Sequence, residues 1–267
     1  MELVRVKSSQ EIWFDLGISF IVGIFFTFVI LVLIALFTST SLQELYHQMH
    51  SYLVISAIWI SIQTSLVVVF LTFIFGFPVA YLLALKEFRG KVLLDTLIDI
   101  PIVLPPLVSG LALLILLGGT GIVGKILNKW NIGIIFTKKG IIIAQFFVAS
   151  PFFIKTVKES ISSIPKSLIS ASATLGASSY YTFRKIILPL SKSGIWAGIA
   201  MTWARAMGEF GATAMVAGCI PGKTETMTIA IYMQAMSGDL ASSTAIALLL
   251  TIFSFSVLII FKKRLKK

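Results

Sequence analysis

Long apolar stretches divide the chain into segments that can cross a membrane. An α-helix rises about 1.5 Å per residue, so about 20 apolar residues span a hydrocarbon core of about 30 Å. Residues 16–38 are uncharged, and so is the longer run 52–85, in which Gly76 and Pro78 predict a kink. Further apolar stretches lie at residues 97–117, 140–154, 193–217 and 242–261. The pattern predicts an all-α membrane protein with six transmembrane helices.

The boundaries of these stretches define the expected organisation. Residues 16–261 form one transmembrane domain between a short N-terminal segment, 1–15, and a basic tail, 262–267. The first apolar stretch is too long for a cleavable signal peptide and has no small-residue cleavage pattern after it. The stretch at residues 140–154 is short, and we expect its helix to continue past Lys155.

Composition excludes several functional classes. The 267 residues are 57% hydrophobic and 12% charged, with a mean hydropathy of +0.99, and no stretch has the composition of a soluble enzyme domain. One cysteine and two histidines exclude an internal disulfide framework and a four-ligand zinc centre. We therefore expect no catalytic residues, no metal and no cofactor.

The net charge of +11 is explained by membrane topology rather than by nucleic acid. With six spans both termini lie on one side, where 16 Lys and Arg residues fall, whereas five fall on the other side. Positive residues concentrate on the cytoplasmic side, so both termini are predicted to be cytoplasmic. The five residues predicted outside are Lys125, Lys129, Lys138, Lys139 and Lys223.

The longest predicted cytoplasmic connection, residues 159–189, contains a candidate surface helix. Pro165 suits the first turn of a helix over residues 166–175, and Gly176 is a natural C-terminal stop. Small residues at 171–173 would let a partner surface approach closely. An amphipathic helix resting on lipid headgroups is the alternative, and the residues alone do not separate the two.

The order of residues in this connection resembles the coupling loop, or EAA loop, of ABC importer permeases. Ser170 stands at the position of the motif's Glu, Ala171 and Ser172 at its two Ala positions, and Gly176 six residues after the first position. The resemblance implies that this helix sits in a groove of a cytoplasmic ATPase. The implied contact residues are Lys166, Leu168, Ser170, Ala171, Ser172, Ala173, Leu175, Gly176 and Ala177.

Later motifs resemble the molybdate branch of these permeases, and sulfate and tungstate permeases share parts of them. They are residues 136–153, 205–213, 220–226 and 230–232. The resemblance implies a type I ABC importer permease fold in a prokaryotic cytoplasmic (inner) membrane. It also implies a homodimer that works with two copies of a separate ABC ATPase and an extracytoplasmic oxyanion-binding protein. The chain itself would contact lipid and catalyse nothing.

Arg205 and Glu209 lie four residues apart within an apolar stretch, so they share a helix face and can pair. An unpaired charge at mid-bilayer costs about 2.5 to 3.5 kcal/mol, so neither should face lipid. The pair either fixes helix packing or shapes the transport pathway, where Glu209 would prevent the Arg from trapping a passing dianion. The candidate pathway residues are Arg205, Gly208, Glu209, Gly211 and Thr213.

Several other features have competing interpretations. Residues 217–224 nearly match a phosphate-binding P-loop, but Ala217 replaces its first Gly and Pro221 removes an amide donor. This segment is therefore either a plain Pro-Gly turn, or a loop that docks a binding protein or borders the external mouth. Asp95 and Asp99 form salt bridges or helix caps, or alternatively a proton site.

Small residues and histidines are also ambiguous. The small side chains at Gly194, Ala197, Gly198 and Ala204 favour a close helix contact, either within the chain or between subunits. His47 and His50 lie in a predicted external loop and are interpreted as solvated.

A secondary transporter is the rival class of function. Such proteins use membrane-embedded acids as ion sites and often contain internal repeats. Here Glu209 is the only acid in the middle of a predicted span, and no repeat is evident.

Overall fold

The computed structural model describes residues 9–265, and the outermost parts of the predicted terminal segments lie outside this range. The described residues form helices and no strand. In chain order they are α1 (Ser9–Thr38), α2 (Leu42–His50), α3 (Tyr52–Leu85), α4 (Lys91–Val103), α5 (Pro106–Leu117), α6 (Ile122–Lys129), α7 (Lys138–Ser162), α8 (Lys166–Thr174), α9 (Ser179–Thr182), a π-helical turn (Phe183–Ile187), α10 (Leu188–Leu190), α11 (Lys192–Met207), α12 (Gly211–Ala217), α13 (Met227–Met236) and α14 (Leu240–Leu265).

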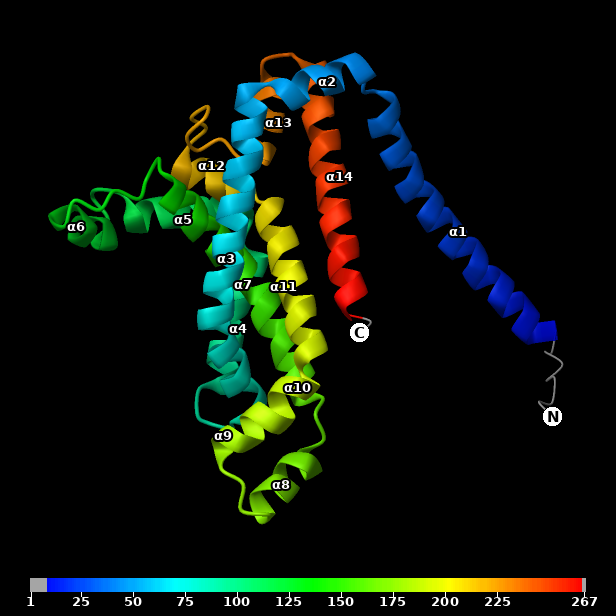
Figure 1. Cartoon of the computed structure of the whole chain (residues 1–267), viewed down its shortest axis with the longest axis vertical. Helices are drawn as coiled ribbons and strands as arrows, with labels where there is room; N and C mark the ends of the chain where they lie inside the picture. Colours follow the sequence, from blue (N-terminus) through cyan, green and yellow to red (C-terminus); the bar gives the residue numbers. More distant parts are fainter. Residues whose placement is uncertain (1–8, 266–267) are drawn as a thin grey trace.

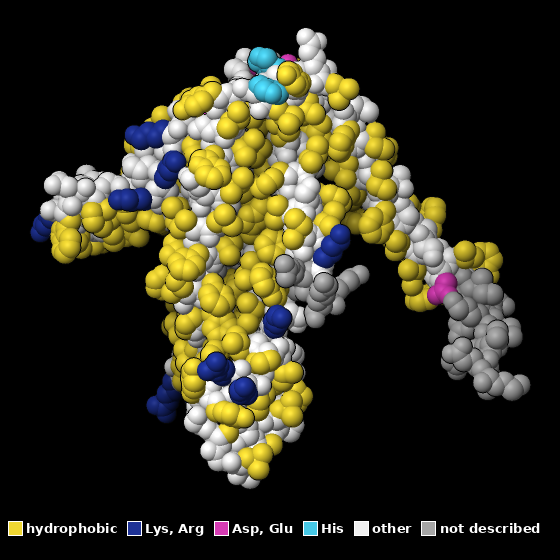
Figure 2. Space-filling model, viewed as in Figure 1, with side chains coloured by type: hydrophobic (Ala, Val, Ile, Leu, Met, Phe, Trp, Pro, Cys, Tyr) yellow, Lys and Arg dark blue, Asp and Glu magenta, His cyan; other side chains and the backbone are white. Residues whose placement is uncertain are grey.

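The helices form an elongated body with two distinct ends (Figure 1). Helices α3, α7 and α11 run along it, α2 lies at one end, and α8 lies at the opposite end. Helix α1 stands away from the body, whereas α5 and α6 project sideways as an arm. On the face that Figure 2 shows, apolar side chains predominate between the two ends of the body. An apolar surface of this kind is suited to lipid, as the sequence predicts.

Helix α7 is the centre of the packing. In the most apolar 18-residue stretch of α7, 56% is buried, compared with 33% in that of α3 and 0% in that of α1. Phe153, Val157 and Ile161 on α7 form one core cluster with Ala80 on α3 and Ile195 on α11. These three α7 residues recur every four positions and so line one helix face.

Small residues bring α7 and its neighbours close together. At Gly198 on α11, a Cβ would lie 3.0 Å from the Phe153 ring, and at Gly194 the space is already filled by Ser160. Gly76 on α3 faces the same part of α7, where a Cβ would lie 3.1 Å from Ile154. For Gly194 and Gly198 the intrachain alternative is therefore correct.

Most of the predicted spans correspond to helices. Residues 52–85 form a single helix, α3, which contains Pro78. The short stretch at 140–154 does continue past Lys155, because α7 extends to Ser162. The last span is longer at both ends than the predicted 242–261, since α14 covers Leu240–Leu265.

The prediction of one helix over residues 97–117 is wrong. Helices α4 and α5 are bent by 111° relative to each other. Leu104 is extended, with ψ of 131°, and the next two residues are Pro105 and Pro106. A residue before proline avoids helical geometry and proline lacks an amide donor, so the helix ends there and restarts with Pro106 in its first turn.

The stretch at 193–217 is also divided. Helix α11 ends at Met207 and α12 begins at Gly211, so Gly208, Glu209 and Phe210 form a break. By length and composition, four helices among the described residues can cross a membrane, and there are five if the bent pair α4–α5 is counted as one broken span. The molecule is thus an all-α multi-pass protein, and the six-span count stays a prediction.

Candidate functional site

The two helix breaks meet where α5 packs against α12. A cavity of about 300 Å³ lies between them. Its lining consists of Pro105, Pro106, Leu107, Arg205, Gly208, Glu209, Phe210 and Gly211. Four of the five predicted pathway residues therefore share one cavity, although the proline break on its other side was not predicted as part of a site.

Arg205 and Glu209 form the expected ion pair. The distance from Arg205 Nη1 to Glu209 Oε2 is 2.6 Å. The Glu209 side chain is 1% exposed, whereas that of Arg205 is 26% exposed and lines the cavity. The other carboxylate oxygen, Oε1, accepts a hydrogen bond from the Ala212 amide at 2.8 Å. Glu209 thus joins the end of α11 to the first turn of α12, where a negative charge is favourable.

Glycines allow the backbones at the breaks to approach closely. A Cβ at Gly211 would lie 3.0 Å from Pro106 Cβ, and one at Gly110 would lie 2.8 Å from the Ala212 Cα. Thr213, the fifth predicted pathway residue, is buried and does not line the cavity. Its position agrees with a packing role better than with direct contact to a cargo.

Helix α13 supports the break, a contact for which the sequence contains only a weak signal. The Thr228 hydroxyl donates to the Glu209 carbonyl at 2.8 Å. The amide of Met227 donates to the buried Ser61 hydroxyl of α3 at 2.9 Å. The available signal was Ser61 together with Thr64 and Ser65, polar residues within an apolar run that mark the buried face of α3.

The predicted surface helix is α8, at the end of the body opposite α2 (Figure 1). Its end has the hydrogen bonds of a Schellman motif: the Ala177 amide donates to Ser172 O at 3.1 Å and the Gly176 amide to Ala173 O at 3.0 Å. Gly176 has φ of +76°, as this C-terminal stop requires. The sequence-predicted boundaries are correct to within one residue.

The predicted contact residues of α8 do not all face outward. Leu168, Ala171 and Leu175 are exposed and lie three or four positions apart, so they form an apolar stripe. Ser170, Lys166, Ala173 and Gly176 are also exposed, and Ala177 is half-buried. Ser172 is buried instead and hydrogen-bonds to Thr182 of α9 through their hydroxyl oxygens, 2.7 Å apart. Ser172 therefore fixes α8 to its own loop.

Two ion pairs connect α4 to the part of α7 that leads into α8. The distance from Lys158 Nζ to Asp95 Oδ2 is 2.6 Å, and that from Lys155 Nζ to Asp99 Oδ1 is 2.5 Å. All four side chains are partly exposed. The salt-bridge interpretation of the two aspartates is therefore correct, and we call these two pairs the α4–α7 clasp.

The segment that resembles a P-loop is a compact turn. The amides of Lys223, Thr224 and Glu225 all donate to Ile220 O, at 3.0 to 3.2 Å. The Ile220 amide donates to the Thr224 hydroxyl at 3.2 Å. Because these amides already have partners, they are not free to surround a phosphate.

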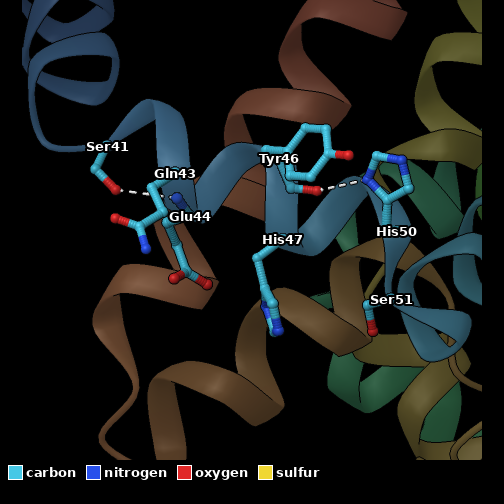
Figure 3. A pocket seen from close by; sticks show the side chains of 7 residues that line it. All are labelled: Ser41, Gln43, Glu44, Tyr46, His47, His50 and Ser51. Carbon is cyan, nitrogen blue, oxygen red and sulfur yellow. Dashed lines mark hydrogen bonds between the residues drawn. The ribbon is translucent and has the colours of Figure 1, made fainter.

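A hollow of about 830 Å³ lies beside α2 (Figure 3). His50 Nδ1 lies 2.8 Å from Tyr46 O, and the two rings are in contact, with centroids 4.3 Å apart. His47 points away from His50 (Figure 3), and both histidines are exposed. No three His, Cys, Asp or Glu residues in the described part of the chain could hold a metal ion.

Comparison with known proteins identifies the family. The family model described as "Binding-protein-dependent transport system inner membrane component" matches residues 76–265. The chain belongs to this family. The matched region includes both breaks, the clasp and α8.

Curated relatives of this family member are transport permeases. This chain is 41% identical over 222 residues to the "Probable transport system permease protein NifC" of Clostridium pasteurianum, and the match covers 82% of this chain and 75% of the relative. This chain is 35% identical over 207 residues to a "Probable sulfate transport system permease protein cysT" of Chlorella vulgaris, and the match covers 77% of this chain and 78% of the relative. It is 37% identical over 194 residues to the "Molybdenum transport system permease protein ModB" of Haemophilus influenzae, with 71% and 85% covered. These names confirm the prediction of a transport permease.

Solved structures agree on the fold. A MetNI methionine ABC transporter chain superposes with a TM-score of 0.65 at 21% identity, covering 80% of this chain and 95% of that one. A chain of a bacterial alginate ABC transporter, solved with a periplasmic protein, gives a TM-score of 0.71 at 15% identity, covering 94% and 93%. The predicted ABC importer permease fold is confirmed.

Proposed function

We propose that this chain is the membrane-spanning subunit of an ATP-driven importer for a tetrahedral oxyanion, with molybdate as the first candidate and sulfate or tungstate as the alternatives. The observation that carries the proposal is the likeness to permeases named for sulfate and molybdenum transport, which covers more than two thirds of the chain. A secondary transporter is disfavoured, because the family is defined by binding-protein-dependent transport.

In the proposed assembly, two copies of the chain form a homodimer in a prokaryotic cytoplasmic membrane, with both termini inside. Each α8 contacts one copy of a cytoplasmic ABC ATPase through the stripe of Leu168, Ala171 and Leu175. Support comes from the exposure of these side chains and from the Ser172–Thr182 hydrogen bond, which holds α8 in one orientation. An extracytoplasmic oxyanion-binding protein docks at the α2 end and supplies most of the affinity.

The break cavity is proposed as part of the transport pathway. The cavity has a volume of about 300 Å³. A water molecule occupies about 30 Å³ in the liquid, so the cavity has room for a tetrahedral anion of five heavy atoms. Arg205 supplies positive charge at the cavity wall. The Glu209 carboxylate, with Oε2 at 2.6 Å from Arg205 Nη1, partly neutralises this charge and so weakens the attraction between Arg205 and a bound anion. Weak binding suits a pathway that must release its cargo.

ATP-driven closure of the ATPases would move α8 and, with it, the α7 end to which it is joined. The α4–α7 clasp transmits this movement to α4, and the α4–α5 bend lies at the cavity. The breaks are suitable hinges because two short helices can change their angle without disrupting a long one.

The test is ATP hydrolysis by the complex of this chain, its ATPase and its binding protein in liposomes. Molybdate, tungstate and sulfate are compared at equal concentration. Stimulation by one of these anions, together with its uptake, supports the proposal and names the substrate. Hydrolysis that none of them stimulates would contradict it.

A further inference from the structure

Helix α6 is amphipathic and projects from the body on the arm that begins with α5 (Figure 1). Ile122, Ile126 and Trp130, the last at the C-terminal cap of the helix, lie four residues apart along one side, with exposed fractions of 79%, 56% and 75%. Lys125 and Asn128 lie on other sides of the helix and are also exposed. The function proposed above uses none of these residues.

The direction of the apolar side is visible in the space-filling view. Hydrophobic side chains gather along the lower side of the arm, which faces the α8 end of the body, and Lys or Arg side chains lie at its tip and upper side (Figure 2). The apolar side of the arm therefore faces toward the α8 end of the body, and its charged side faces toward the α2 end.

The orientation of α6 is fixed by its connections. The Gly121 amide donates to Gly118 O at 2.8 Å, and Gly124 packs against the same carbonyl so closely that a Cβ has no space. After α6 the chain returns to the body, where the Phe136 amide donates to Val216 O of α12 at 3.1 Å. Helix α6 is thus held against the end of α5, and the chain that follows it is tied to α12.

We propose that α6 lies in the outer interface of the membrane. Its Ile122–Ile126–Trp130 edge enters the acyl boundary, and Lys125 and Lys129 contact anionic lipid phosphates. Three large apolar side chains exposed on one edge are unfavourable in water, and a tryptophan beside lysines is typical of membrane interfaces. The lysines complement the charge of the phosphates.

This anchor would set the depth of α5 in the membrane. Because α5 packs against α12 and lines the cavity with its first residues, the lipid interface would hold one wall of the cavity in place. The inference rests on the membrane location of the chain, and it does not depend on which cargo is carried.

The experiment measures the depth of two positions on opposite sides of α6. In a Cys219→Ser background, Ile126→Cys and Asn128→Cys each receive a polarity-sensitive fluorophore in the full chain, reconstituted in phosphatidylcholine liposomes with and without phosphatidylglycerol. Two residues turn a helix by about 200°, so the labels face opposite ways. A nitroxide on the lipid chain near the headgroup and aqueous iodide are the quenchers.

We expect the lipid nitroxide to quench position 126 at least about twofold more strongly than position 128, and iodide to show the reverse order. Phosphatidylglycerol should increase the lipid quenching at 126, and Lys125→Gln with Lys129→Gln should remove that increase. Equal iodide access at both positions would overturn the proposal. It would also be overturned if position 126 became shielded only after binding protein was added, because α6 would then be a protein docking surface.

Discussion

Glu209 Oε2 lies 2.6 Å from Arg205 Nη1 across the end of α11, while Glu209 Oε1 accepts a hydrogen bond from the Ala212 amide of α12. One carboxylate therefore neutralises an arginine at a cavity wall and also satisfies the first turn of the next helix. The two roles can be separated by mutation, because an amide side chain can keep the hydrogen bond to Ala212 but cannot neutralise Arg205.

The first prediction is a double-mutant cycle on this pair. Glu209→Gln leaves an uncompensated Arg205 charge, so it should lower folded yield and lower uptake further by retaining anions. Adding Arg205→Gln should recover much of the loss, with a coupling of about 0.5 to 3 kcal/mol. Uptake and folded yield of all four combinations measure the coupling.

A matched control separates pairing from capping. Glu209→Ala removes both the ion pair and the Ala212 cap, so Arg205→Gln should rescue it less well than it rescues Glu209→Gln. Strictly additive losses in the Gln cycle would mean that the two side chains act independently.

The second prediction concerns the exposed and buried sides of α8. Ala171→Trp adds bulk to the exposed stripe and should abolish ATPase binding while the membrane fold stays intact. Ala171→Ser, which keeps the side chain small, is the control and should bind normally. Co-purification with the ATPase and thermal unfolding of the chain are measured together. Normal ATPase binding by the Trp variant would exclude this stripe as the contact.

The buried side should behave differently. Ser172→Ala removes the hydrogen bond to Thr182 and should cost about 1 kcal/mol locally, because the Thr182 hydroxyl then keeps only its hydrogen bond to Ser178 O. We expect a lower affinity for the ATPase, with the same maximum amount of ATPase bound at saturation. A thermal unfolding midpoint and binding curve identical to those of the unmodified chain would contradict a positioning role.

The elements that were predicted well are those with a strong local signal. The ends of α8 follow from Pro165 and Gly176, and the Arg205–Glu209 pair follows from four-residue spacing in an apolar stretch. The bend between α4 and α5 was missed, although Pro105 and Pro106 were visible. In a membrane helix a proline can either kink the helix or end it, and the outcome depends on packing partners such as Gly211 of α12.

The cavity could not be predicted for the same reason. It forms between residues about a hundred positions apart, and only the fold brings Pro106 next to Gly211. The burial of Ser172 is a further example, because the resemblance placed it among the contact residues, whereas α9 supplies a nearby hydroxyl that turns it inward.

The third prediction concerns the α4–α7 clasp. Lys158→Asp places like charges opposite each other at Asp95 and should lower transport more than stability, since partly exposed pairs contribute about 0.2 to 1 kcal/mol. Adding Asp95→Lys restores an attractive pair with reversed sign and should restore coupling. The ratio of anion transported to ATP hydrolysed in liposomes is the measurement. A ratio that is unchanged in all variants would show that the clasp transmits nothing.

The last prediction concerns pH and the loop between α12 and α13. Burial raises the pKa of Glu225 above its ordinary value, and Oε2 of this carboxyl has no hydrogen-bond partner among the described residues. A carboxyl whose pKa is higher in the folded state stabilises the fold while it is protonated, and this contribution is lost as pH rises through the folded-state pKa. Glu225→Gln should therefore raise the thermal unfolding midpoint at pH 7 and have little effect at pH 4, with a correspondingly flatter pH profile between them.

Glu87→Gln is a suitable control for the Glu225 prediction, because Lys91 lowers the pKa of exposed Glu87. The pH dependence of the unfolding midpoint should therefore change in the opposite sense. If Glu225→Gln lowers the midpoint at pH 7, the ionised carboxylate is stabilised in the fold and the burial argument is wrong.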